Sequence, residues 1–201
     1  MIKRLLAGVF ALTASVAAYA VPITDVQDYT SNTASEYFVD NDANKYDSGI
    51  WRGASEDWGW VHNAIAGTFS SIILEISAFD IDSPDEIDNV YAWDGSDWFL
   101  LGNLMGTDDT WEFTVFDLTG YAWAETQVNA GLQLWLDIDV ANEGWLVTLA
   151  KSTLSVDGGN QQCVPQPGAP CTSTNVSEPY TVALLGLSLF GLASVRRRKQ
   201  A

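Results

Sequence analysis

The sequence predicts an all-β domain, an antiparallel β-sandwich or jelly roll, between two apolar terminal segments. Three observations support this fold class. Helix-period patterns are nearly absent, short stretches of apolar and polar alternation recur along the chain, and turn-forming residues separate those stretches. The part between the two terminal segments, residues 21–157, has the length of one ordinary domain.

Residues 1–20 have the three parts of a secretory signal peptide. Lys3 and Arg4 give a positive start, residues 5–16 are mostly apolar, and a small-x-small cleavage site ends the segment at Ala18-Tyr19-Ala20. We therefore expect an N-terminal signal helix that is cleaved after Ala20. An uncleaved membrane anchor is the alternative, although the apolar stretch is short for a span.

The strands of the first half of the domain follow from period-two alternation. Over residues 71–81, Ile72, Leu74 and Ile76 share one face of the predicted strand. Two shorter strands at 90–93 and 98–101 flank an Asp-Gly-Ser-Asp sequence, which predicts a hairpin turn.

The second half of the domain continues this pattern. A strand is predicted at 111–116, a short helix at 120–128 and a long strand at 132–140, in which leucines alternate with more polar residues. Gly144 then turns the chain into a closing strand at 145–156.

Residues 158–176 are rich in Gly, Gln, Pro, Ser and Thr and are predicted to be a linker. The only two cysteines of the chain, Cys163 and Cys171, lie in it. Outside the cytoplasm neighbouring cysteines tend to pair, so we expect a disulfide that stiffens a stalk. Without histidine neighbours the two thiols make a poor metal site.

The chain ends in a second apolar stretch, residues 180–195, followed by a basic end at 196–199. As a helix this stretch would reach about 24 Å, short of the ~30 Å core of a bilayer, and it can span if the arginines snorkel. Basic residues favour the cytoplasmic side, which would place the preceding domain outside. Residues 177–200 are thus predicted to be a tail with a single transmembrane helix.

The box Ser177-Glu178-Pro179, the short apolar stretch and the terminal cluster Arg196, Arg197 and Arg198 together resemble the PEP-CTERM sorting signal. Ser177 stands where that family usually has the first proline of a Pro-Glu-Pro box. Residues 71–157 also resemble a β-sandwich domain without assigned catalysis that such proteins often carry.

The resemblance of the tail implies an exosortase-like processing enzyme as a partner. It also implies an inner-membrane-anchored precursor and a final place at the cell surface or in the extracellular matrix of a Gram-negative bacterium that makes exopolysaccharide. A plain tail anchor that no enzyme recognises is the alternative.

The charge of the exported part is strongly acidic. All 26 acidic residues lie between 21 and 179, where only Lys45, Arg52 and Lys151 are basic. Nucleic acid is excluded as a partner, because phosphates need cationic side chains. Such a surface favours solubility and attracts divalent cations.

One group of carboxylates suggests a cofactor. Asp80 and Asp82 share a face near Asp88, and Asp137 and Asp139 share a face of another predicted strand. If those strands are neighbours, a hard cation would relieve the repulsion between the carboxylates, and we hypothesise a Ca²⁺ site formed by these five residues. Exposed acids at strand ends, without an ion, are the alternative.

The nine tryptophans suggest a binding surface. Trp58 and Trp60 point the same way from one strand beside His62, and Trp98 flanks the predicted hairpin turn. Rings of this kind near solvent can stack on sugars, so these three tryptophans are candidate glycan-binding residues. Packing in the core of the sandwich is the alternative.

Catalytic patterns are weak. His62 is the only histidine, no Gly-x-Ser-x-Gly elbow occurs and phosphate-binding loops are absent. We therefore expect a non-enzymatic protein that is structural or adhesive in exopolysaccharide. The alternative is a secreted carbohydrate-active enzyme or a glycan-binding module.

Overall fold

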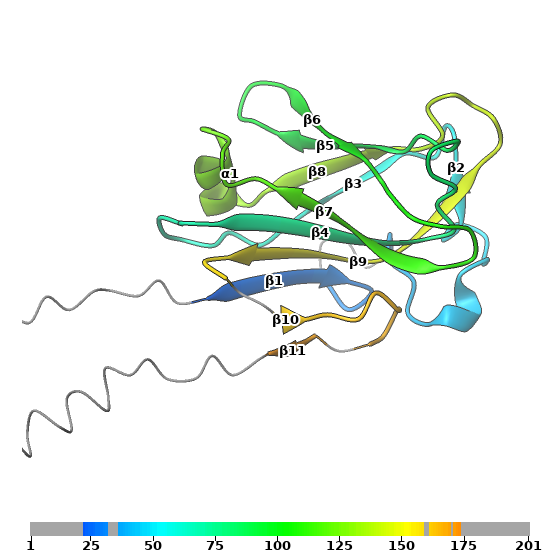
Figure 1. Cartoon of the computed structure of the whole chain (residues 1–201), viewed down its shortest axis with the longest axis horizontal. Helices are drawn as coiled ribbons and strands as arrows, with labels where there is room; N and C mark the ends of the chain where they lie inside the picture. Colours follow the sequence, from blue (N-terminus) through cyan, green and yellow to red (C-terminus); the bar gives the residue numbers. More distant parts are fainter. Residues whose placement is uncertain (1–21, 32–35, 159–160, 170, 174–201) are drawn as a thin grey trace, which may run out of the picture.

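The computed structural model describes residues 22–31, 36–158, 161–169 and 171–173. Its strands form two antiparallel main sheets that lie face to face (Figure 1). The first sheet has the order β1-β9-β4-β7, with β2 pairing on β9, and the second has the order β3-β8-β5-β6. The predicted all-β, antiparallel sandwich is confirmed at this level, whereas the signal helix at 1–20 and the transmembrane helix at 180–195 fall outside the described residues.

The elements of the first sheet are β1 (Ile23–Asp28), β2 (Arg52–Gly53), β4 (Ile72–Phe79), β7 (Trp111–Asp117) and β9 (Leu146–Val156). Those of the second sheet are β3 (Trp58–Val61), β5 (Asn89–Trp93), β6 (Trp98–Asn103) and β8 (Gln133–Asp137). The remaining elements are the 3₁₀ turn η1 (Asp42–Asn44), the helix α1 (Ala124–Ala130) and the short pair β10 (Gln161–Gln162) and β11 (Thr172–Ser173). The described residues contain no helix with the length and hydropathy that a bilayer crossing requires.

Most predicted elements form where the alternation placed them. The β5–β6 hairpin closes through Asp94, whose carboxylate accepts hydrogen bonds from the backbone N–H groups of Ser96 and Asp97. The strand predicted at 132–140 ends earlier, at Asp137. Asp139 adopts φ of 46°, a conformation that interrupts extended pairing.

The core lies between the sheets and is supplied by alternate residues of each strand. Leu134 and Leu136 of β8 are buried together with Leu74 and Ile76 of β4 and Leu154 of β9. Full burial of each such side chain contributes roughly 1.5–3 kcal/mol. Because a shift of one residue would turn these side chains to solvent, the core fixes the register of both sheets.

The outer face of the first sheet is covered at one end by the segment 38–51. Val39 and Ile50 pack on Phe79, Trp111 and Ala150, which point away from the main core. The backbone N–H of Val39 also donates to the carbonyl oxygen of Leu149, at 2.9 Å. A second, smaller core therefore forms outside this sheet.

The hairpin 161–173 covers another part of the same face, although the sequence predicts a linker there. The predicted disulfide joins Cys163 to Cys171, and β10 pairs with β11. Ser77 donates to the carbonyl oxygen of Pro165 at 2.5 Å, and the ammonium of Lys151 donates to the carbonyl oxygen of Ala169 at 2.7 Å. The linker prediction is thus wrong for this part, because buried polar groups of β4 and β9 need the carbonyl groups of the hairpin.

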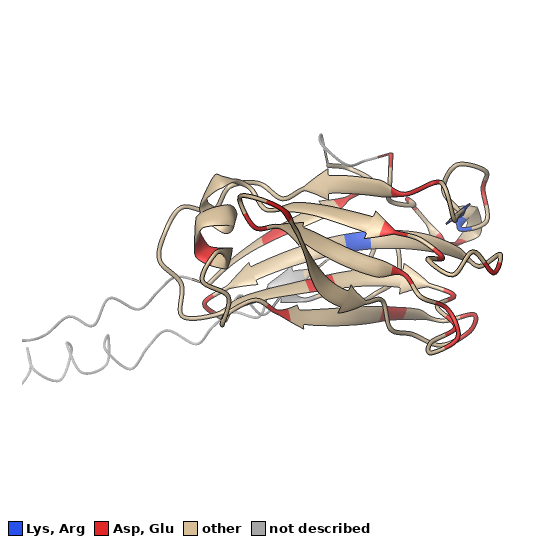
Figure 2. Cartoon of the chain, turned by 90° about the horizontal axis from the view of Figure 1, so that it is seen from above, with Lys and Arg blue, Asp and Glu red and all other residues tan. Residues whose placement is uncertain are grey.

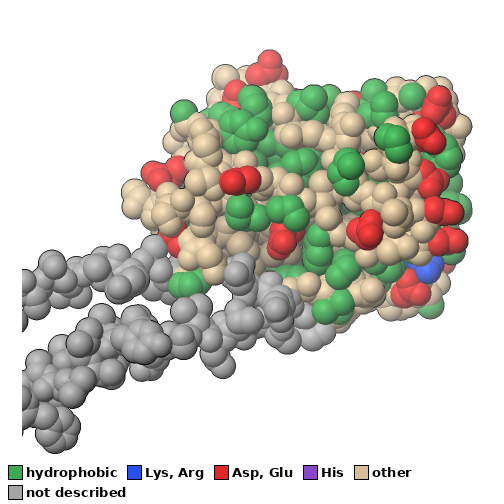
Figure 3. All heavy atoms as spheres, viewed as in Figure 1, with side chains coloured by type: hydrophobic (Ala, Val, Ile, Leu, Met, Phe, Trp, Pro, Cys, Tyr) green, Lys and Arg blue, Asp and Glu red, His purple; other side chains and the backbone are tan. Residues whose placement is uncertain are grey.

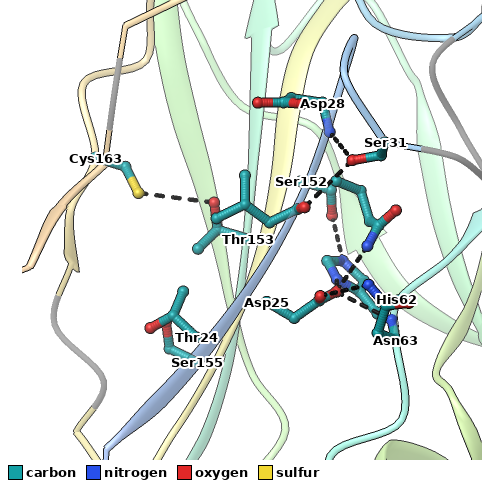
Figure 4. A network of polar contacts seen from close by, with 12 residues as sticks. Thr24, Asp25, Asp28, Ser31, His62, Asn63, Ser152, Thr153, Ser155 and Cys163 are labelled. Atoms are coloured by element: carbon teal, nitrogen blue, oxygen red, sulfur yellow. Dashed lines mark hydrogen bonds and ion pairs between the residues drawn. The ribbon is translucent and has the colours of Figure 1, made fainter.

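A polar contact ties the edges of the two sheets together (Figure 4). His62, just after β3, places Nδ1 at 2.7 Å from the Asp25 carboxylate of β1 and Nε2 at 2.8 Å from the Ser152 hydroxyl of β9. Asp25 also accepts hydrogen bonds from the backbone and the side chain of Asn63.

The protonation states in this contact follow from its surroundings. Burial lowers the pKa of His62, although Asp25 opposes this shift. Burial alone would raise the pKa of Asp25, but hydrogen bonds from His62, Asn63 and Gln27 outweigh it and lower the pKa to about 2. A neutral His62 therefore donates from Nδ1 to the ionised Asp25, and its Nε2 accepts from Ser152.

We expect Asp25→Asn to lower the free energy of unfolding by about 1.5–3 kcal/mol at neutral pH, the range for hydrogen bonds to a charged group. Urea unfolding measures this change. Asp85→Asn is the matched control, because Asp85 is exposed, and its effect should stay within about 0.5 kcal/mol. Equal, small effects of the two substitutions would show that the contact contributes nothing to stability.

Candidate functional site

The outer face of the second sheet carries aromatic side chains that alternate with the core residues. Tyr91 and Trp93 come from β5, Trp98 and Leu100 from β6, and Trp135 from β8. We name these five residues the aromatic face. Trp98 and Trp135 are 40% and 37% exposed, so their rings are accessible to a ligand.

The register of the strands places these side chains side by side. Trp93 pairs with Trp98, and Tyr91 pairs with Leu100 on one side and Trp135 on the other. The ring centroids of Trp93 and Trp98 lie 5.7 Å apart, and those of Trp98 and Trp135 lie 6.3 Å apart. The contacting rings are inclined to each other by 71° and 46°, so they form an uneven platform of several ring surfaces.

Polar side chains border this platform on the same sheet. Asn89 pairs with Asp137, and the Asn89 amide donates to the Tyr91 hydroxyl at 3.4 Å. Gln133 is exposed two residues before Trp135, on the same face of β8. Rings flanked by amide and carboxyl groups can hold the apolar side of a sugar and hydrogen-bond its hydroxyls.

The predicted glycan-binding set Trp58, Trp60 and Trp98 is corrected by this arrangement. Trp58 and Trp60 do point the same way, but inward, and each is only 2% exposed. Trp58 stacks on Tyr37 with ring centroids 5.8 Å apart, and Trp60 meets Phe38 edge-on at 5.6 Å. These two rings belong to the core, where alternation buries them, and of the three only Trp98 lies on an open face.

Carboxylates gather in the loops at one end of the sandwich (Figures 2 and 3). Of the predicted calcium ligands, Asp80, Asp82 and Asp88 lie between β4 and β5, Asp137 is the last residue of β8, and Asp139 follows that strand. The structure does not bring Asp80, Asp82, Asp88, Asp137 and Asp139 into one site. Among the described residues, the only group of three potential ligands within 4.8 Å of one another is Asp80, Asp108 and Asp109. The prediction of one five-carboxylate site is therefore wrong, and calcium binding stays a prediction.

Three of the predicted ligands already have other partners, and two of these three, Asp139 and Asp80, hold loops. The Asp139 carboxylate accepts from the backbone N–H groups of Glu143 and Gly144 at 2.9 and 2.8 Å, and so holds the loop before β9. Asp80 accepts from the backbone N–H of Asp109 at 2.9 Å. Both residues have positive φ, 65° at Asp80 and 46° at Asp139, which places them in turns rather than on the strand faces that the sequence predicts.

A buried carboxyl pair lies close to these loops. Glu86 accepts from the backbone N–H of Asp82 at 2.9 Å, and Asp88 accepts from that of Asp139 at 2.8 Å. Their other oxygens, Glu86 Oε1 and Asp88 Oδ2, are buried and receive no hydrogen bond from any other described group. Burial, and then the charge of Asp88, raise the pKa of Glu86 to about 9, so a proton on Glu86 joins the two carboxyl groups at neutral pH.

Asp25, His62 and Ser152 form a chain of carboxylate, imidazole and hydroxyl, as in the catalytic triad of a hydrolase. A hydrolase needs its serine hydroxyl open to the substrate. Both Ser152 and His62 are completely buried, and Ser152 faces the core beside Leu154. In this conformation no substrate reaches the hydroxyl, and the contact holds the two sheets together.

Several residues of these sites escaped the sequence analysis. Trp135 could have been included in the binding set, since it alternates with Leu134 and Leu136 and so must point outward. Glu86 gave no such signal, because its burial depends on the turn that folds it back toward Asp82.

Glu86→Gln should stabilise the protein at about pH 8 and have little effect at about pH 5. The folded pKa of Glu86, about 9, lies above the unfolded value of 4.5. Its stabilising contribution is therefore complete below pH 4.5 and is lost as the pH rises toward 9. The side-chain amide introduced by Glu86→Gln keeps the hydrogen bonds of the protonated carboxyl group and does not titrate.

Urea midpoints of wild type and Glu86→Gln across this pH range measure the effect, with exposed Asp85→Asn as the control. A pH dependence that is the same in wild type and Glu86→Gln would refute the buried proton. If Ca²⁺ replaces the proton on Glu86, added calcium will raise the urea midpoint of wild type at about pH 8. The urea midpoint of Glu86→Gln will stay unchanged.

The comparisons with known proteins bear on the tail and on little else. A search of curated proteins gives no match. One solved structure with some likeness is the coat protein of Tobacco streak virus, at 14% identity, covering 79% of this chain and 90% of that chain with a TM-score of 0.29. A likeness of this size supports no inference about this protein.

The end of the chain has a defined identity. Residues 175–199 match the model of the PEP-CTERM protein-sorting motif. The predicted sorting residues Ser177, Glu178 and Pro179 and the arginines 196–198 all fall within that match, although they lie outside the described residues. The end of the chain is therefore similar to the PEP-CTERM protein-sorting motif, a signal that implies export and recognition by an exosortase.

Proposed function

We propose that this protein is a non-catalytic structural or adhesive component of an exopolysaccharide matrix at the surface of a Gram-negative bacterium. The observation that carries the proposal is the sorting motif at 175–199, which follows directly on a folded β-sandwich. A signal peptide at 1–20 would export the chain, and the apolar stretch at 180–195 would hold it until an exosortase-like enzyme cuts near Glu178-Pro179.

Two properties of the described domain fit a place outside the cytoplasm. The disulfide between Cys163 and Cys171 needs an oxidising compartment. The excess of acidic residues, which lie mostly in loops and on the surface, keeps a protein soluble in a crowded matrix (Figure 2).

The alternative of a polysaccharide-cleaving enzyme has less support. Such an enzyme needs two carboxyl groups beside the bond that it cuts. Glu86, whose pKa burial and the charge of Asp88 raise to about 9, is buried beside Asp88 and keeps its proton inside the protein. The glycan-binding alternative is better supported, by the aromatic face.

Processing of the tail tests the proposal. In a host with an active exosortase, we expect intact mass to show a mature protein that lacks residues 1–20 and the segment after the Glu178-Pro179 region, in the matrix fraction. The double substitution Glu178→Ala and Pro179→Ala should leave a longer, membrane-bound form. Ser177→Pro, which restores the usual box, is the control and should be processed at least as fast as wild type.

A wild-type chain that keeps its C-terminus in such a host, or that stays in the cytoplasm, would refute the proposal. So would equal processing of wild type and the Glu178 and Pro179 variant, because the sorting box would then have no role.

A further inference from the structure

We propose that the aromatic face binds a neutral polysaccharide chain, an inference that rests on the proposed function and names the partner of the domain. The face consists of Tyr91, Trp93, Trp98, Leu100 and Trp135, as defined above. Its ligand class is a chain of uncharged sugars that lies along the second sheet.

The two outer faces of the sandwich differ in how much of their apolar surface is covered. Parts of the outer face of the first sheet are covered by the segment 38–51 and by the hairpin 161–173, and Val115 of β7, which stays 56% exposed there, has no ring. On the second sheet, Trp98, Leu100 and Trp135 remain exposed. Large apolar side chains that gather on one exposed face of a soluble protein mark a binding surface.

The aromatic face combines ring surfaces with amide groups. Trp98 contacts both Trp93 and Trp135, at centroid distances of 5.7 and 6.3 Å, so the rings continue across β5, β6 and β8. The amides of Asn89 and Gln133 lie on the same face and can donate and accept hydrogen bonds. Sugar rings offer apolar C–H surfaces for the aromatic rings and hydroxyls for the amides.

The aromatic face carries little charge. The exported part of the chain is strongly acidic, yet on the outward positions of β3, β5, β6 and β8 only Asp137 carries a charge. An anionic polysaccharide would be repelled by the whole protein, and a cationic one would bind the acidic loops instead of this face. A neutral chain suits a platform of rings and amides.

The same charge argues against the other occupants of an apolar face. A second copy of this chain would bring an equally acidic domain against the first, with Asp137 of each copy at the contact. An anionic lipid surface would meet the same repulsion. The test below separates these occupants from a glycan.

The experiment is affinity electrophoresis of the full-length chain in non-ionic detergent, in native gels that contain glucomannan, hydroxyethyl cellulose or alginate. We expect at least one of the two neutral polymers to retard the protein, and alginate, which is anionic, to leave its mobility unchanged. Trp98→Ala and Trp135→Ala should each raise the dissociation constant by about fivefold to tenfold, the equivalent of losing one ring contact. Trp98→Tyr, which keeps a ring, should retain most of the binding.

Trp145→Ala is the matched control, because Trp145 is a partly exposed tryptophan outside the second sheet. This variant should bind the polymers as wild type does. If an alanine variant does not fold, Trp98→Tyr still tests the inference, provided that its thermal unfolding matches that of wild type. Three results would each overturn the inference: no retardation by either neutral polymer, equal loss of binding in Trp145→Ala, or retardation that Trp98→Ala and Trp135→Ala leave unchanged.

Two further results would assign the face to another occupant and would also overturn the inference. One is a dimer in sedimentation that Trp98→Ala dissociates, and the other is binding to anionic vesicles that depends on Trp98. Failure of glycan binding with normal tail processing would overturn this inference and leave the proposed function intact. Failed tail processing with normal glycan binding would refute the proposed function and leave the binding surface standing.

Discussion

The unequal covering of the two sheets is the constraint on which the rest of the structure depends. A sandwich buries the inner faces of its sheets, and each outer face must be covered, polar or functional. Here the segment 38–51 and the disulfide-linked hairpin 161–173 cover parts of the outer face of the first sheet. The second sheet keeps an outer face of aromatic side chains, and this difference separates the covered side of the protein from its binding side.

The covering segments use polar contacts as well as apolar ones. Lys151, one of three basic residues in the exported part, is buried under the hairpin and donates to a carbonyl oxygen there. At the edge of the sandwich, His62 joins β1 and β9 of the first sheet to the end of β3 in the second. Breaking either contact would leave a buried polar group without a partner, which typically costs about 1–3 kcal/mol.

Local alternation of apolar and polar residues predicts part of the fold. The strand at 71–81 and the hairpin around Asp94 follow from patterns within a few residues, and the structure confirms them, whereas the short helix predicted at 120–128 forms later, at Ala124–Ala130. Local alternation did not predict β1, because Ile23–Asp28 is mostly polar and its pairing with β9 depends on a partner far along the chain. The folding of the hairpin 161–173 onto the sheet was missed for the same reason.

For the candidate sites, the alternation of apolar and polar residues along a strand does not suffice to predict which side chains come together. It places Trp58 and Trp60 together on one face but cannot decide which face is the inner one, and the pairing of β3 with β8 in the structure turns both rings inward. Of the five predicted calcium ligands, Asp80 and Asp139 have positive φ, which redirects their carboxylates, whereas Asp137 is the last residue of β8. Residues that act through turns or through distant contacts, such as Glu86 and Ser152, leave no periodic signal.

Oxidative footprinting of the tryptophans, read by peptide mass spectrometry, tests most directly whether one sheet has an open aromatic side. The account predicts that Trp98 and Trp135 are oxidised quickly, that Trp58 and Trp60 are protected, and that a neutral glucan slows oxidation of the first pair only. Rapid oxidation of Trp58 or Trp60 in the folded protein, or protection of Trp98 and Trp135 without any ligand, would contradict it.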